Sequence, residues 1–407
     1  MTLKVLVTVG TRPEAIKMAP LILAMQKDPR FKCLVCSTGQ HKEMLQQVMD
    51  WFGIRADYTL DVMQPGQPLA KLSGRILSGM EDVFSHHRPD IAMVHGDTTT
   101  AFLAALAAFY NYDFYQKSKI KVAHIEAGLR TGNMLSPYPE EGNRRLIAPL
   151  ADFHFAPTLT AAHCLNAEGV YKDIFITGNT VIDALYETQK RIEPLNIDPF
   201  PFIENKQKVI LVTGHRRENY GEGFSNLCQA LKDIADKYND VDIVYPVHLN
   251  PNVKGPVNDT LKGYHNIHLV DPMDYPTFIA AMCQSHIILT DSGGLQEEAP
   301  SLGKPVLVLR DTTERPEALK AGTVKMVGTN PTLILNTVSK LMEDPDYYKK
   351  MASAVNPYGD GQATRRILNI LAGEHPAENT FAAQGNAAVL MQKHSSTAWN
   401  VTNPAYK

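Results

Sequence analysis

The sequence predicts an α/β protein with two doubly wound, Rossmann-like domains and a ligand cleft between them. Short aliphatic runs alternate with helical patterns along the chain, which is typical of βαβ units and parallel sheets. With 407 residues, of which 44% are hydrophobic, the chain exceeds what one core usually serves. The stretch 191–208 contains three prolines and little periodicity, so it divides one set of units from the other.

The aliphatic runs give the expected strands in order. They lie at 4–9, 32–37, 91–94 and 122–125, and then at 209–213, 243–247, 287–290 and 306–309. Helical patterns occupy 140–150, 181–191 and 361–371. The aromatic and basic connection 110–119 is interpreted as a surface loop, with a partner contact as the alternative. Residues 373–407 lack a sustained period, which predicts a disordered tail.

Composition limits the possible partners and the compartment. The formal charge is −3 and the pI is about 6.5, so no global basic field favours nucleic acid or anionic lipid. Five cysteines are an odd, thinly spread set, which argues against a disulfide framework. Arg12, Glu14 and Lys17 interrupt the apolar N-terminus, leaving neither a signal peptide nor a membrane span. We therefore expect a cytoplasmic protein.

The strand at 287–290 ends in the most informative segment, 291–300. Ser292, Gly293 and Gly294 predict a phosphate cradle, because glycines let backbone N–H groups approach an anion and Ser292 can cap the helix that follows. Glu298 is positioned to accept hydrogen bonds from ribose hydroxyls. The alternative is that Ser-Gly-Gly is only a tight strand-to-helix turn.

Other strands also end in charged residues and glycine. Arg12 and Lys17 follow the first strand and are candidate phosphate or sugar contacts, while Asp97, Glu126 and His215 follow three further strands. Ligands of open α/β sheets bind beyond the carboxyl ends of strands. For any one residue a helix cap or an ion pair is the alternative, and Asp97 before three threonines would make a good N-cap. Because four or five strands end this way, the pattern as a whole favours a shared ligand site over independent caps and ion pairs.

Three weaker candidates have alternatives of their own. Glu140 and Glu141 begin a helix, where acidic residues ordinarily compensate the helix dipole. Arg315 follows the strand at 306–309 and serves either a phosphate or an ion pair with Glu314. Phe278 is placed either to flank a base or to fill the core.

Missing motifs narrow the chemistry further. The sequence has no Walker motif, no Gly-x-Gly-x-x-Gly after a strand and no His-Glu-x-x-His. The pairs Asp240/Asp242 and Asp344/Asp346 have the spacing of a metal-sugar-nucleotide motif, but solvated turns explain them better. We therefore expect no cofactor and no metal.

Taken together, the strand-end motifs resemble those of one enzyme family. The segments are GTRPEAIK from Gly10, HGDTTT from His95, HIEAGLRT from His124, PEEGNR from Pro139, GHRREN from Gly214 and TDSGG from Thr290. They are similar to the bacterial non-hydrolysing UDP-N-acetylglucosamine 2-epimerases, and the likeness covers roughly residues 3–372.

This resemblance implies a GT-B architecture, a homodimer and an active site in the interdomain cleft. It implies domains at 1–190 and 191–358, with the last helix, 359–372, crossing back to the first. The residues matching the family's catalytic set are Asp97, Glu126, Glu140, Lys17 and His215. Those matching its UDP-binding set are Arg12, Phe278, Ser292, Gly293, Gly294, Glu298 and Arg315.

In some family members a second UDP-N-acetylglucosamine binds as an allosteric activator. The matching residues here are Gln40, Glu43, Glu140, Arg216 and His248. The chain departs from certain relatives, which have glutamine and arginine where it has Glu43 and Gly66.

The expected reaction is reversible epimerisation at C2, with the product supplying bacterial surface polysaccharide. The hydrogen on C2 is not next to a carbonyl, so C1–O cleavage must accompany its loss, giving a glycal and UDP. Asp97 and Glu126 are expected to share the proton transfers with help from Glu140. The alternatives are a retaining GT-B glycosyltransferase, a hydrolysing epimerase and a catalytically inactive sugar-nucleotide sensor.

Overall fold

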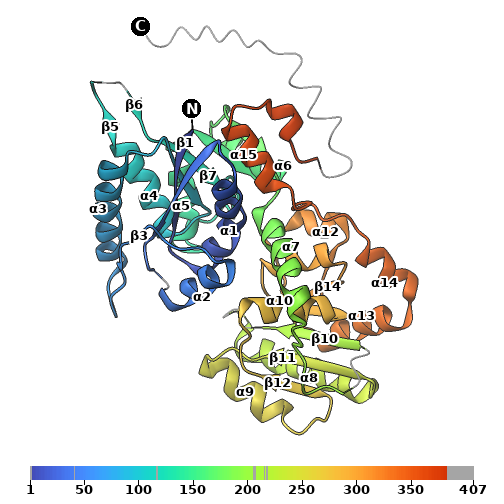
Figure 1. Cartoon of the computed structure of the whole chain (residues 1–407). Coiled ribbons are helices and arrows are strands. Elements are labelled where there is room, and N and C mark those ends of the chain that lie inside the picture. The colour runs from blue at the N-terminus through green and yellow to red at the C-terminus, as the bar shows by residue number, and fades with distance from the viewer. Residues whose placement is uncertain are drawn as a thin grey trace.

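Two parallel sheets form the framework of the protein, with helix α7 (Thr180–Ile192) between them (Figure 1). The structure is a computed structural model, and it describes residues 2–40, 42–115, 118–204, 208–214, 216 and 219–382. The predicted fold class, two doubly wound Rossmann-like units, is confirmed. The division of the chain at residue 190 stays a prediction.

The first sheet has seven parallel strands in the order β3-β2-β1-β4-β7-β8-β9. They are β1 (Leu3–Val9), β2 (Phe31–Ser37), β3 (Tyr58–Thr59), β4 (Ile91–His95), β7 (Lys121–Ile125), β8 (Phe153–Ala156) and β9 (Ile174–Ile176). The helices are α1 (Arg12–Lys27), α2 (Lys42–Phe52), α3 (Leu69–His87), α4 (Thr99–Tyr110), α5 (Glu140–Ile147) and α6 (Leu159–Ala167). Along β1, Val5 and Val7 pack with α1 and α2, whereas Leu6 packs with α3 and α4. Helices thus cover both faces, as a parallel sheet requires.

The second sheet has six parallel strands in the order β12-β11-β10-β13-β14-β15. They are β10 (Lys208–Thr213), β11 (Val241–Pro246), β12 (Ile267–Val270), β13 (Ile287–Thr290), β14 (Val306–Val308) and β15 (Val324–Met326). The helices are α8 (Glu222–Lys237), α9 (Pro251–Leu261), α10 (Tyr275–Gln284), α11 (Leu295–Glu298), α12 (Pro316–Ala321), α13 (Pro331–Glu343) and α14 (Pro345–Ala352). The last helix, α15 (Ala363–Leu371), packs instead against α1 and α7. The predicted strands are all present, and β3, β8, β9, β12 and β15 are additional.

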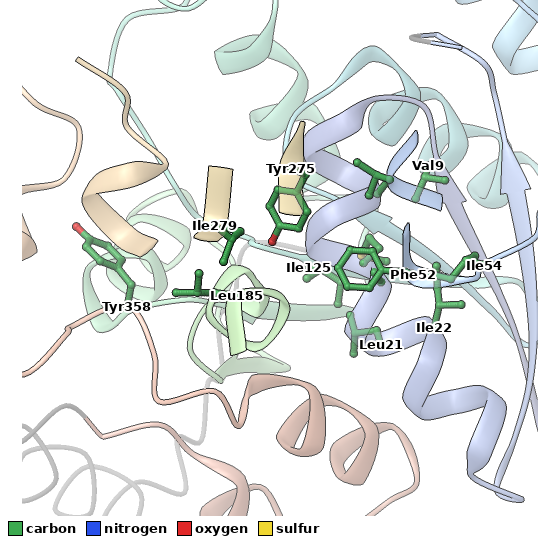
Figure 2. Packing of buried hydrophobic residues seen from close by; sticks show 14 of the residues in the cluster. Val9, Leu21, Ile22, Phe52, Ile54, Ile125, Leu185, Tyr275, Ile279 and Tyr358 are labelled. Atoms are coloured by element: carbon green, nitrogen blue, oxygen red, sulfur yellow. The ribbon is translucent and has the colours of Figure 1, made fainter. Parts of the chain in front are cut away.

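One hydrophobic cluster runs through both halves of the molecule. It includes Leu21 of α1, Phe52 of α2 and Leu185 of α7 together with Tyr275 and Ile279 of α10 (Figure 2). The rings of Phe52 and Tyr275, one from each half, have centroids 6.1 Å apart. Burial of apolar surface therefore joins the two sheets as well as stabilising each one.

The prediction that the disordered tail begins at residue 373 is wrong for its first part. Residues Pro376–Asn379 form a 3-10 turn, and Phe381 is buried against β9. The Phe381 N–H donates to the Ile176 carbonyl over 2.7 Å, and Arg366 of α15 lies over its ring. An aromatic side chain and a vacant strand edge thus order a segment whose composition indicated none. Residues 383–407 lie outside the described part.

The connection 110–119 is a small hairpin. Strands β5 (Tyr112–Asp113) and β6 (Ser118–Lys119) pair antiparallel, and Phe114 and Tyr115 are exposed. The surface position is as predicted, but the paired strands were not anticipated. Among the described residues, no helix combines the length and apolar character needed to cross a bilayer.

The cysteines are structural. All five are free, and burial raises the pKa of Cys33 and of Cys36 to about 12. A thiol with such a pKa is not a nucleophile near neutral pH. The Cys-x-x-Cys spacing in β2 therefore reflects strand packing.

Candidate active site

Each sheet changes its winding direction at one point, and the predicted site residues follow the strands there. In the first sheet the change lies between β1 and β4, which lead into Gly10–Arg12 and Gly96–Asp97. In the second it lies between β10 and β13, which lead into Gly214 and Asp291–Gly294. Ligands of open α/β sheets bind beyond such switch points.

Glu126 follows β7 and forms an ion pair with Lys17 of α1. Both side chains are largely buried, with 9% and 14% of their surface exposed. Burial is the largest single effect and would raise the pKa of the Glu126 carboxyl, but the charge and hydrogen bond of Lys17 together with the neighbouring His95 and Arg315 outweigh it, and the pKa lies well below its usual range. Glu126 also has a left-handed backbone with φ of 61°, a conformation that costs about 1–3 kcal/mol and often marks functional positions. The structure thus joins two predicted catalytic residues.

His95 is a buried neutral group beside this pair. Its Nε2 lies 3.7 Å from Glu126 Oε2 and has no hydrogen-bond partner among the described residues. Burial lowers the pKa of His95 to about 4, so the ring is uncharged near neutral pH. We did not predict His95 as a site residue, although it stands in the strand-end motif that contains Asp97.

Asp97 pairs with a cation and does not cap a helix. Arg144 of α5 donates to Asp97 Oδ2, and Asn143 Nδ2 donates to the Asp97 carbonyl over 2.9 Å. The N-cap of α4 is Thr98, whose hydroxyl accepts from the N–H of Ala101. The cap suggested as the alternative role of Asp97 is therefore wrong, because the next residue fills it.

The two carboxylates at the start of α5 have separate environments. Glu141 has no exposed surface, accepts from the Thr131 N–H and pairs with Arg144. Glu140 Oε2 is buried but has no hydrogen-bond partner among the described residues. Glu141 therefore holds the preceding loop, whereas Glu140 retains an oxygen for another group.

A buried bridge connects the first half of the site to the second. Asn179 Nδ2 donates to Glu126 Oε2 and to Glu297 Oε2, each over 2.7 Å. Arg315 Nε in turn donates to Glu297 Oε1. The suggested ion pair between Arg315 and Glu314 is wrong, because Glu314 pairs with Arg310 at 2.7 Å. Neither Asn179 nor Glu297 was predicted.

The Ser-Gly-Gly segment is built differently from the expected cradle. The predicted Ser292 cap is wrong: the N-cap of α11 is Gly294, and no side chain caps it. The Ser292 N–H donates to Thr290 Oγ1 over 2.9 Å. Helix α11 has only four residues and continues as a 3-10 turn (Ala299–Leu302), so little helix dipole is available. Side chains must therefore carry most of the anion binding expected here.

One cation and one carboxyl group lie beside the two glycines. A Cβ on Gly293 would lie 4.0 Å from Arg216 Nη2, and one on Gly294 would lie 3.6 Å from Glu298 Oε2. Burial raises the pKa of Glu298 to about 7, and the charges of Lys17 and Arg12 act in the opposite direction. Predicted residues of both halves therefore share one electrostatic environment.

Several predicted residues have contacts outside this network. Phe278 is partly buried against the main core. Thr100 donates to Gln40 Oε1 over 3.0 Å, Glu43 is exposed, and His248 Nδ1 accepts from the N–H of Asn250. Their binding roles stay predictions. His215 lies outside the described residues.

A cavity of about 820 Å³ lies away from this site. It is bordered by α1, α7, the end of α10 and the turn at Gly361, and none of the predicted site residues lines it. Cavity size alone therefore does not identify the site. In the part of the chain that the structure describes, no three His, Cys, Asp or Glu side chains are grouped to hold a metal ion.

The sequence profile of the family described as UDP-N-acetylglucosamine 2-epimerase matches residues 23–372. The chain belongs to this family. A UDP-N-acetylglucosamine 2-epimerase of Escherichia coli K12 is 53% identical over 376 residues, covering 91% of this chain and 98% of that protein. One from Neisseria meningitidis serogroup A is 52% identical over 375 residues, covering 91% and 99%.

Solved epimerase structures share the fold. The crystal structure of UDP-GlcNAc 2-epimerase from Neisseria meningitidis bound to UDP-GlcNAc has a TM-score of 0.82 and 51% identity, covering 91% of this chain and 100% of that one. A putative epimerase from Listeria monocytogenes has a TM-score of 0.85 and 45% identity, covering 94% and 100%. These matches confirm the resemblance drawn from the motifs and the GT-B-like fold, and they place the chain among isomerases.

Proposed function

We propose that the protein interconverts UDP-N-acetylglucosamine (UDP-GlcNAc) and UDP-N-acetylmannosamine by inverting C2 of the sugar. Family membership supports the substrate and the reaction class. The observation that carries the proposal is the buried connection from Lys17 and Glu126 to Glu297 and Arg315, because it joins proton-handling groups to the nucleotide half.

The proposed path is elimination followed by re-addition. The bond between C1 and the β-phosphate oxygen breaks, UDP departs, and a carboxylate takes the C2 proton to leave a glycal. A proton then adds to C2 from the opposite face while the UDP oxygen attacks C1, so atoms and electrons balance without a cofactor. Two carboxylates on opposite faces of the sugar are required.

We assign these proton transfers to Asp97 and Glu126, with Glu140 assisting. Arg144 pairs with Asp97 and Lys17 pairs with Glu126, so each of the first two carboxylates has a cation beside it. Arg12, His215, Arg315 and the Ser292–Gly294 segment are proposed to hold UDP, with Glu298 on the ribose and Phe278 on the base. Cations near the departing pyrophosphate stabilise its developing charge.

Three further assignments remain proposals. The protein is expected to be a homodimer in the cytoplasm, which the free cysteines suit. A second UDP-GlcNAc is proposed as activator at Gln40, Glu43, Glu140, Arg216 and His248. The product is proposed to supply surface polysaccharide.

Incubation with UDP-GlcNAc in heavy water tests the reaction. We expect both epimers to appear, each with deuterium at C2, because the abstracted proton exchanges with solvent. Product without deuterium at C2 rules out this path. Free N-acetylmannosamine would instead indicate a hydrolysing enzyme, and a requirement for an acceptor would indicate a glycosyltransferase.

A further inference from the structure

Asn179 is held in one orientation at the start of α7. Its Oδ1 accepts from the N–H of Val181 over 3.1 Å, so it is the N-cap of the helix, and only 2% of the residue is exposed. Its own N–H donates to the carbonyl of Tyr358 over 2.7 Å. Because the amide oxygen is used by the helix, the NH₂ group must point the other way.

That NH₂ group serves two carboxylates at once. One hydrogen goes to Glu126 Oε2 and the other to Glu297 Oε2, each over 2.7 Å. An amide NH₂ group only donates, so both carboxyl oxygens act as acceptors. Lys17 pairs with the same Oε2 of Glu126, and Arg315 pairs with the other carboxylate oxygen of Glu297, Oε1. The resulting order is cation, carboxylate, amide, carboxylate, cation.

The bridge also spans the molecule. Glu126 follows strand β7 of the first sheet, Glu297 belongs to α11 beyond the second sheet, and Asn179 starts the helix between them. The Glu297 carbonyl is fixed in addition by Asn356 Nδ2 over 2.7 Å. Movement of α11 relative to β7 must therefore change the contacts of Asn179.

We propose that Asn179 is a positioning residue for the epimerisation: its amide aims Glu126 and ties that carboxylate to Glu297 and Arg315. The inference rests on the proposed function. Lys17 has a flexible stem and can follow Glu126 through several positions, whereas a capped amide allows one. The residue itself need not touch the sugar.

Two substitutions keep the helix cap and remove the bridge. Asn179→Asp retains the capping oxygen but places a third carboxylate beside those of Glu126 and Glu297. Asn179→Ser retains a capping oxygen and can donate one hydrogen bond at most. For Asn179→Asp we expect kcat to fall at least about 100-fold, and the acid limb of the kcat/KM profile to move up by about one pH unit or more, because repulsion favours protonation. Asn179→Ser should lose roughly tenfold in kcat with a smaller movement of the same limb.

Asn330 provides matched controls. It is the N-cap of α13, where its Oδ1 accepts from the N–H of Leu333 over 2.9 Å, and its amide bridges no carboxylates among the described residues. Asn330→Asp and Asn330→Ser should keep kcat within about twofold of the parent value. The acid limb of their kcat/KM profiles should stay at the parent pH. If Asn179→Asp does not fold, Asn179→Ser decides. The inference is overturned if Asn179→Ser alters only Tm, as the Asn330 variants do. Failure of the unmodified enzyme to epimerise UDP-GlcNAc would instead overturn the proposed function.

Discussion

At the scale of single residues, adjacent carboxylates in this protein differ because their partners differ. Glu141 is enclosed by Arg144 and by backbone N–H groups, whereas Glu140 keeps one buried oxygen unpaired among the described residues. Similarly, Glu297 pairs with Arg315, whereas burial leaves Glu298 with a pKa of about 7. Neighbouring glutamates in this sequence therefore have different environments and different ionisation behaviour or hydrogen bonding.

Paired substitutions at the start of α5 should separate catalysis from stability. Glu140→Gln removes the proposed assisting carboxylate but no described hydrogen bond of Oε2, so we expect kcat to fall at least about 100-fold with Tm unchanged. Glu141→Gln breaks buried ion pairs and should lower the free energy of unfolding by about 2 kcal/mol. Urea titrations and initial rates measure both. Equal loss of stability in the two variants contradicts the assignment.

Glu298 should make substrate binding depend on pH. Its folded-state pKa is raised to about 7 from 4.5 by burial, so in the empty enzyme its contribution to stability is complete below about pH 4.5 and is lost as pH rises through 7. The ionised form accepts ribose hydroxyls, and UDP-GlcNAc itself does not titrate here. Affinity should therefore rise roughly tenfold from pH 6 to 8. Calorimetry in a Glu140→Gln background measures this, and adding Glu298→Gln should flatten the profile.

Part of the site could be predicted from the sequence because strand ends are local signals. Asp97 and Glu126 each follow an aliphatic run, and open sheets bring such ends together. The partners of these carboxylates could not be predicted. Arg144 lies 47 residues from Asp97, and Asn179 lies 118 residues from Glu297. Such pairings depend on side-chain directions that spacing does not encode.

At the scale of elements, close packing of the turn after β7 against α6 depends on one glycine. Gly128 has φ of +88°, and a Cβ there would lie 2.2 Å from the carbonyl oxygen of Ala161 in α6. Gly128→Ala must therefore displace backbone, and we expect a loss of roughly 3 kcal/mol or more together with most activity. Gly132→Ala is the matched control, because φ is +78° but nothing lies within 4 Å. It should cost only about 1 kcal/mol of backbone strain. Thermal unfolding measures the Tm of both variants. Equal Tm values would show that a Cβ at residue 128 does not clash with the Ala161 carbonyl.

Element prediction succeeded where hydrophobic periodicity was strong and failed where tertiary contacts decide. The buried strands β1 and β13 are long aliphatic runs, and α7 extends the predicted helix by one residue at each end. The short edge strands β3 and β15 have two and three residues, too few for a period. Phe381 is ordered by Ile176 of β9 and by Arg366 of α15, and neither residue belongs to the short segment that contains Phe381.

At the scale of the whole molecule, helix α7 takes part in both the apolar and the polar contacts between the halves. The shared core joins α1 and α2 to α10 around α7 (Figure 2), and the polar bridge runs from Glu126 through Asn179 at the start of α7 to Glu297. The C-terminal helix adds a third link, since Asp183 of α7 accepts from the N–H groups of Ala363 and Thr364. Contacts between the two halves are therefore concentrated on α7.

Hydrogen exchange should reveal this convergence. The proposed site uses Asp97 and Glu126 from the first half and the Ser292–Gly294 segment from the second. Saturating UDP-GlcNAc should therefore slow amide exchange in all three of these segments. Backbone amides in α3 and α14, on the outer faces of the two halves, should be unaffected (Figure 1). Exchange followed by mass spectrometry, with a Glu140→Gln variant to limit turnover, makes the comparison. Protection confined to the second half would mean that the carboxylates of the first half do not meet the bound sugar nucleotide, and the assignment of acid/base roles to them would be lost.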